Sequence, residues 1–172
     1  SANAEKIGVN EVFSYGCGHC FNFQSELHPW VKKLPADVDF QSTPAVWGKN
    51  LELFARAYYA AKVLDVLDKV HMPIFDAIHV KKKSVKKQSD FEVIFVAEGV
   101  SKEKFSNAFN SFGTTSMVNQ AKSRVRAYRV RGTPEVIVNG KYRVSTTKAG
   151  GFKGMLKVAE FLIEKERAAK AK

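Results

Sequence analysis

A chain of 172 residues that is 45% hydrophobic and 26% charged has the composition of one folded globular domain, or of a domain with an insertion. No run reaches the roughly 18 apolar residues of a membrane helix, and the N-terminal residues lack the pattern of a signal peptide. The net charge is +11, but the densest basic run, residues 81–87, contains no aromatic residue. We therefore interpret it as a solvated connection, with a binding patch as the alternative, and expect no nucleic-acid partner.

The first predicted strand, residues 7–14, leads directly into a pair of cysteines. Alternate residues of this strand are apolar except for Glu11, which is therefore a carboxylate in an apolar row. Apolar residues at helical spacing predict a helix after Cys17, with Pro29 inside it. A turn and a second predicted strand at residues 38–42 follow.

Residues 48–130 show helical periodicity throughout. Ser89 is a predicted N-cap of a helix that stops at Gly99, and Ser101 is predicted to open the next helix. In that next helix we expect an apolar stripe that packs in the core and a stop at Gly113. The stripe consists of Phe105, Phe109 and Phe112.

Strand periodicity returns at residues 134–145. The dipeptide Asn139-Gly140 between two β-rich runs predicts a hairpin. Gly150 and Gly151 predict a turn before a last helix at residues 152–168. The order of strand, helix, strand, helical block, hairpin and helix predicts an α/β layer interrupted by helices.

The only two cysteines of the chain lie in "VFSYGCGHCFNFQ", at the predicted junction of the first strand and first helix. Cys17 ends the strand and Cys20 lies one helical turn later, so the two are close enough for a disulfide. The first turn of a helix has unpaired N–H groups and the positive end of the helix dipole. Both favour a thiolate on Cys17, which is the reactive form of cysteine.

The helix alone has a limited effect on this thiol. A dipole contribution of at most about 2 kcal/mol corresponds to a decrease of roughly 1.5 units in the pKa of Cys17. His19 can lower this pKa further by donating a hydrogen bond to the sulfur or by carrying charge. A low thiol pKa stabilises the reduced form and makes the disulfide more oxidising.

Paired cysteines also occur in zinc sites and in inert structural disulfides. A zinc site needs four ligands, and His28, His71 and His79 fall at no zinc-finger spacing. A disulfide that closes so small a loop constrains the unfolded chain little. We therefore favour redox chemistry and expect no metal and no cofactor.

The stretches "EVFSYGCGHCFNF" and "RGTPEVIVNGKYRV", with a long helical insertion between them, resemble the thioredoxin superfamily. Within it they are most similar to the DsbA family, the thiol:disulfide oxidases of the bacterial periplasm. The end of the chain, "LIEKERAAKAK", resembles Pseudomonas-type gamma-proteobacterial members. The resemblance implies a thioredoxin-like mixed sheet with flanking helices, formed by residues 1–47 and 131–172, and an inserted all-helical domain with a connecting helix at residues 48–130.

The resemblance also implies roles for individual residues. Cys17 corresponds to the exposed attacking cysteine, Cys20 to its buried partner, and His19 to the residue that tunes the thiolate. Thr133-Pro134 corresponds to the cis-proline loop that offers backbone to an extended substrate. Glu11 corresponds to an acidic group beneath the active site, which could accept or relay the proton of Cys20.

The sequence departs from the family in two respects that bear on the site. Most members have proline where this chain has Gly18, and the Gly-His dipeptide is also that of protein disulfide isomerases, so a milder reduction potential is expected. Some members have an acid at the position of Gln24 and a lysine near Ser42; neither residue is charged in this chain.

The function implied by the resemblance is donation of the Cys17–Cys20 disulfide to reduced, unfolded secreted proteins through a mixed disulfide at Cys17. The implied partners are these substrates and a quinone-linked membrane oxidase of the DsbB type. We expect a monomer in the periplasm, in its mature form without a signal peptide. The alternatives are a disulfide isomerase or reductase of the same superfamily, or a chaperone-like module that binds peptides.

Overall fold

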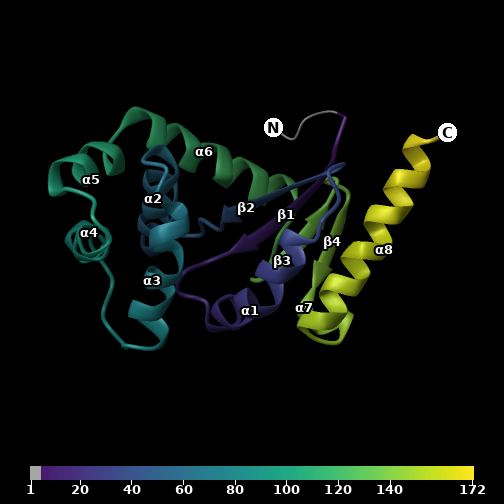
Figure 1. Cartoon of the computed structure of the whole chain (residues 1–172), viewed down its shortest axis with the longest axis horizontal. Coiled ribbons are helices and arrows are strands. Elements are labelled where there is room, and N and C mark those ends of the chain that lie inside the picture. Colours follow the sequence, from purple (N-terminus) through teal and green to yellow (C-terminus); the bar gives the residue numbers. More distant parts are fainter. Residues whose placement is uncertain (1–4) are drawn as a thin grey trace. The chain divides into compact units, whose positions relative to one another are not determined.

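The computed structural model describes residues 5–172 and contains two compact units (Figure 1). The sheet unit comprises the described residues up to Phe13, together with His19–Thr43 and Val125–Lys172. The helical unit comprises Ser14–Gly18 and Pro44–Arg124. The order of elements expected from the sequence is confirmed, whereas the domain boundaries at residues 48 and 131 stay a prediction.

The sheet unit contains four strands in the order β2-β1-β3-β4, in which β3 is antiparallel to both β1 and β4. The strands are β1 (Ile7–Phe13), β2 (Val38–Pro44), β3 (Glu135–Val138) and β4 (Tyr142–Ser145). The helices of this unit are α1 (Gly18–Lys32), α7 (Thr146–Ala149) and α8 (Phe152–Lys170). Of these, the four-residue helix α7 has no counterpart in the sequence-based prediction.

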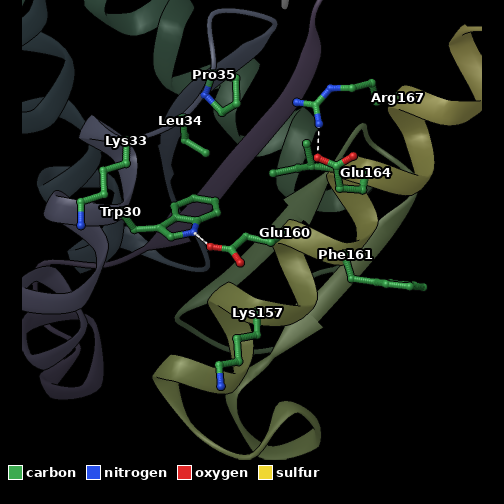
Figure 2. Close-up of a pocket in the computed structure, with 10 residues that line it drawn as sticks. Trp30, Lys33, Leu34, Pro35, Lys157, Glu160, Phe161, Glu164 and Arg167 are labelled. Atoms are coloured by element: carbon green, nitrogen blue, oxygen red, sulfur yellow. Dashed lines mark hydrogen bonds and ion pairs between the residues drawn. The ribbon is translucent and has the colours of Figure 1, made fainter.

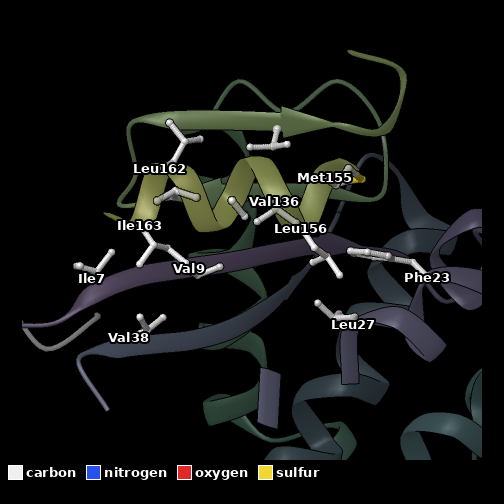
Figure 3. Close-up of a cluster of buried hydrophobic side chains, with 13 residues drawn as sticks. Ile7, Val9, Phe23, Leu27, Val38, Val136, Met155, Leu156, Leu162 and Ile163 are labelled. Carbon is white, nitrogen blue, oxygen red and sulfur yellow. The ribbon is translucent and has the colours of Figure 1, made fainter. Parts of the chain in front are cut away.

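Helices α1 and α8 and the strands share one hydrophobic core, shown in Figure 3. Phe23 and Leu27 of α1 enter it together with Ile7 and Val9 of β1. Because alternate residues of a strand point to the same face, Glu11 projects on the same side of β1 as Ile7 and Val9. The strand therefore places a carboxylate beside α1.

The helical unit packs around phenylalanine rings. Its elements are α2 (Lys49–Val63), α3 (Leu67–His79), α4 (Gln88–Ala97), α5 (Lys102–Phe109) and α6 (Phe112–Ala127), the last of which continues into the sheet unit. The ring centroid of Phe105 lies 4.6 Å from that of Phe95 and 5.3 Å from that of Phe109. These three rings are almost completely buried.

The predicted start of α4 was wrong, whereas its end was correct. The helix begins at Gln88, before Ser89, and the carboxylate of Asp90 accepts hydrogen bonds from the backbone N–H groups of Lys86 and Lys87, at 2.9 and 3.1 Å. An acidic side chain reaching back thus caps the helix in place of the predicted serine. Gly99 follows the helix with φ of 92°, as a stop signal requires.

The prediction that Phe105, Phe109 and Phe112 all pack in the core was only partly correct. Phe105 and Phe109 are buried, but the side chain of Phe112 is 87% exposed. The predicted stop at Gly113 was also wrong, because α5 ends at Phe109 and α6 starts at Phe112. The hydroxyl of Ser111 accepts a hydrogen bond from the backbone N–H of Thr114 at 3.1 Å, which favours a new helix start there.

Two further local predictions are confirmed. Ser101 caps α5, since its side chain accepts a hydrogen bond from the backbone N–H of Lys104. Asn139 and Gly140 turn the chain between β3 and β4 with φ of 54° and 68°. Both values lie in the left-handed region that asparagine and glycine tolerate best.

Candidate active site

The two cysteines flank the start of α1 and differ in exposure. Cys17 lies immediately before Gly18, the first residue of the helix, and is partly exposed, whereas Cys20 in the first turn is 0% exposed. The first turn contains no acidic side chain that would compete for the positive end of the helix dipole. This arrangement supports a thiolate on the sulfur that solvent can reach. His19 is exposed beside it, and its tuning role stays a prediction.

Glu11 is completely buried and is held by side chains from two neighbouring elements. Gln24 Nε2 of α1 donates a hydrogen bond to Glu11 Oε2 at 3.0 Å, and Ser42 Oγ of β2 donates to Oε1 at 2.9 Å. Each carboxylate oxygen therefore accepts from a different donor. The two hydrogen bonds fix the orientation of this buried carboxyl group.

Gln24 links Glu11 to the second cysteine. Its Nε2 also donates to the backbone oxygen of Cys20 at 3.0 Å. Because the backbone oxygen of Cys20 can only accept, the amide cannot be turned around, and its buried Oε1 makes no hydrogen bond. Gln24 and Ser42, which are neutral where some family members have charged residues, thus both donate hydrogen bonds to Glu11.

The peptide bond between Thr133 and Pro134 is cis. The sheet register pairs Val12 of β1 with Glu135 of β3. Pro134 therefore precedes β3 at the end of the sheet where β1 gives way to the segment that carries Cys17. The role of Thr133 and Pro134 in binding substrate stays a prediction.

A groove of about 480 Å³ lies between α1 and α8, as Figure 2 shows. Trp30 lines it and donates from Nε1 to Glu160 Oε1 at 2.9 Å. Trp30 follows Cys20 by ten positions, which is about 15 Å along a helix. Trp30 is consequently distant from Cys20.

Two kinds of feature are absent from residues 5–172. No group of three or more metal-ligating side chains is arranged to hold an ion. No helix in that range has the length and apolar character to cross a membrane.

Comparison with known proteins decides the family. A family model described as a DSBA-like thioredoxin domain matches residues 32–155. Thiol:disulfide interchange protein DsbA of Pseudomonas aeruginosa strain PAO1 is 41% identical over 167 residues, which cover 97% of this chain and 79% of that protein. The chain belongs to the DsbA family.

Other DsbA proteins agree with this assignment in sequence and in structure. The DsbA of Azotobacter vinelandii is 38% identical over 98% of this chain and 78% of its own length. The crystal structure of Pseudomonas aeruginosa DsbA superposes with a TM-score of 0.96 at 40% identity, covering 100% of this chain and 90% of that one. The predicted thioredoxin-like fold with a helical insertion and the resemblance to Pseudomonas-type members are therefore confirmed.

The match to the family model begins at residue 32, after the cysteine pair. The alignment with Pseudomonas aeruginosa DsbA covers 97% of the chain and therefore includes residues 17–20. The links from Glu11 to Gln24 and Ser42 could not be read from the sequence, because these contacts join residues 13 and 31 positions apart. In the sequence, the only indication of these contacts is that Gln24 and Ser42 are both neutral where some family members have charged residues.

Proposed function

We propose that this protein is an oxidase that donates the disulfide between Cys17 and Cys20 to reduced proteins. The observation that carries this proposal is the unequal exposure of the two sulfurs at the start of α1, with Cys17 reachable and Cys20 buried. Membership of the DsbA family makes the chain a thiol:disulfide oxidoreductase, and its relatives are named thiol:disulfide interchange proteins.

The reaction proceeds by two exchanges of sulfur bonds. A substrate thiolate attacks Sγ of Cys17 in the oxidised protein, forming a mixed disulfide and releasing Cys20 as a thiolate. A second substrate thiolate then attacks the substrate sulfur of the mixed disulfide and releases Cys17 as a thiolate. The substrate loses two electrons and gains a disulfide, and the CxxC pair gains those two electrons.

Glu11 is placed to donate a proton to Cys20 and to accept it again. A thiolate released in a buried position is costly unless it takes up a proton. When the reduced pair is reoxidised, Cys20 must lose that proton again before it can attack. Glu11, held through Gln24 to the backbone of Cys20, is the buried carboxylate that we assign to this exchange.

The family assignment also indicates partners and location. We assign reduced, unfolded secreted proteins as substrates, with the backbone at Thr133 and Pro134 receiving an extended segment. Reoxidation then requires an electron acceptor, for which we assign a quinone-linked membrane protein of the DsbB type. We place the protein in the periplasm, as a monomer.

The dipeptide Gly18-His19 favours one alternative, an isomerase or reductase with a milder potential. The reduction potential against glutathione separates the two functions. We expect a value between those of DsbA and protein disulfide isomerase, about −120 and about −180 mV. A value near the −270 mV or so of thioredoxin would remove the oxidase assignment.

A second measurement tests the chemistry directly. Oxidised protein should restore disulfides to a reduced test protein in stoichiometric amounts. The Cys17→Ser and Cys20→Ser variants should both fail to do so. If instead these variants and the parent bind unfolded peptides equally and none oxidises the test protein, the chain is a peptide-binding module.

A further inference from the structure

The segment that leads into Cys17 is held by helix α3 through Tyr15. The side chain of Tyr15 is 0% exposed. Its hydroxyl lies 2.7 Å from Nδ1 of His71, and its backbone oxygen lies 2.7 Å from Nε2 of His79. Because a carbonyl oxygen can only accept, Nε2 of His79 carries the hydrogen in this contact.

The two histidines lie on one face of α3 with a phenylalanine between them. His71, Phe75 and His79 follow one another at intervals of four residues, which places them in a row along the helix. The ring centroid of Tyr15 lies 5.3 Å from that of His71 and 4.9 Å from that of Phe75, both in edge-to-face geometry. The row therefore holds the ring of Tyr15 as well as its two oxygens.

These contacts act on a turn that ends at the attacking cysteine. The backbone N–H of Cys17 donates to the oxygen of Ser14 at 3.1 Å, so Tyr15 and Gly16 occupy the centre of this turn. A Cβ atom added to Gly16 would lie 2.9 Å from the ring of Phe54 in α2. Helix α3 thus contacts Tyr15, and Phe54 of α2 lies against Gly16, the other central residue of the turn.

We propose that His71 and His79 are positioning residues for the redox reaction, which fix the turn that carries Cys17 by holding Tyr15. This proposal rests on the oxidase function proposed above and adds residues of the helical unit to it. Their effect on Cys17 is indirect. The first turn of α1 favours a thiolate only while the sulfur stays beside its unpaired N–H groups, and a loosened turn lets the sulfur leave them.

The expected effect is a shift in the reactivity of Cys17 with pH. We would follow alkylation of Cys17 in the reduced, full-length protein with iodoacetamide across a pH series. Loss of one hydrogen bond that is fully coupled to the thiolate would move the midpoint by at most about one pH unit. We expect His79→Leu to raise the midpoint by about half a unit. His79→Gln, which keeps an N–H donor, should restore most of the difference.

The control must lower stability without touching Tyr15. Ile74→Val removes one buried methylene group from the same helix and leaves both histidines in place. Its alkylation midpoint should equal that of the parent protein. Tyr15→Phe retains the ring and removes only the hydroxyl, so it tests the contact with His71 separately.

The outcomes separate this inference from the oxidase assignment. If folded His79→Leu and Tyr15→Phe proteins react with the parental midpoint, or if Ile74→Val shifts it equally, the positioning role is refuted while the oxidase remains. If the parent protein itself does not oxidise a reduced test protein, the proposed function fails whatever the variants do.

Discussion

Replacing Gln24 by glutamate would place a second carboxylate against Glu11. The two side chains are 2% and 0% exposed, and the atoms concerned lie 3.0 Å apart in the parent protein. At that distance, and with an effective dielectric constant of about 20, two negative charges repel by about 5 kcal/mol. This corresponds to roughly 4 pKa units, so the folded pair should retain one proton at neutral pH.

The retained proton makes the stability of Gln24→Glu depend on pH. Unfolded glutamate loses its proton near pH 4.3, so above about that pH the folded variant binds one more proton than the unfolded chain. Its free energy of unfolding, relative to the parent, should therefore fall as pH rises. Between about pH 5 and pH 7 the decrease should be about 2–3 kcal/mol.

Urea unfolding at several pH values measures this difference. Gln120→Glu, which adds the same carboxylate at an exposed position of α6, is the matched control and should show no such trend. A difference between Gln24→Glu and the parent that stays constant with pH would refute the reasoning. It would mean that Glu11 already carries a proton in the parent protein.

Four further predictions concern single residues. Glu11→Gln should slow oxidation of a reduced test protein more than it changes the reduction potential, and parental rates would contradict the proton role. His19→Ala should raise the pKa of the Cys17 thiol and make the disulfide less oxidising, as a thiolate absorbance titration can check. The hydrogen bond from Arg167 lowers the pKa of the Asp37 carboxyl, so its stabilisation is present at neutral pH and is lost as pH falls through the folded-state pKa. Asp37→Asn should accordingly reduce the acid sensitivity seen in urea unfolding. Phe112→Ser should change the free energy of unfolding by no more than about 0.5 kcal/mol, because the ring is exposed.

The sequence predicted those parts of the fold that depend on local chemistry. Asn139 and Gly140 form the expected hairpin because the left-handed conformation is a property of those two residues. The start of α4 differs from the prediction because the carboxylate of Asp90, inside the helix, caps it in place of a preceding serine. Phe112 is exposed because Ser111 caps a new helix, so that Phe112 no longer continues the apolar face of α5.

The site was predictable to the extent that it is contiguous in the sequence. Cys17, His19 and Cys20 lie within four residues, and the strand pattern placed Glu11 in an apolar row. The contacts of Tyr15 with His71 and His79 join residues 56 and 64 positions apart. No periodicity in the sequence connects such positions, and the only pattern that the sequence allows to be tested for these histidines is zinc-finger spacing, which they do not fit.

The burial of one sulfur and not the other also provides a way to find the molecules that this protein meets in its cell. A Cys20→Ser chain activated at Cys17 with a small aromatic disulfide can still be attacked by a client thiol, which expels the aromatic thiolate. No neighbouring thiol is then present to release the client, so the adduct should survive denaturing electrophoresis without reductant. The converse Cys17→Ser chain keeps its remaining sulfur inside the protein and should capture nothing. Mass spectrometry of the first sample, with the second as background, would therefore identify the clients of the exposed cysteine.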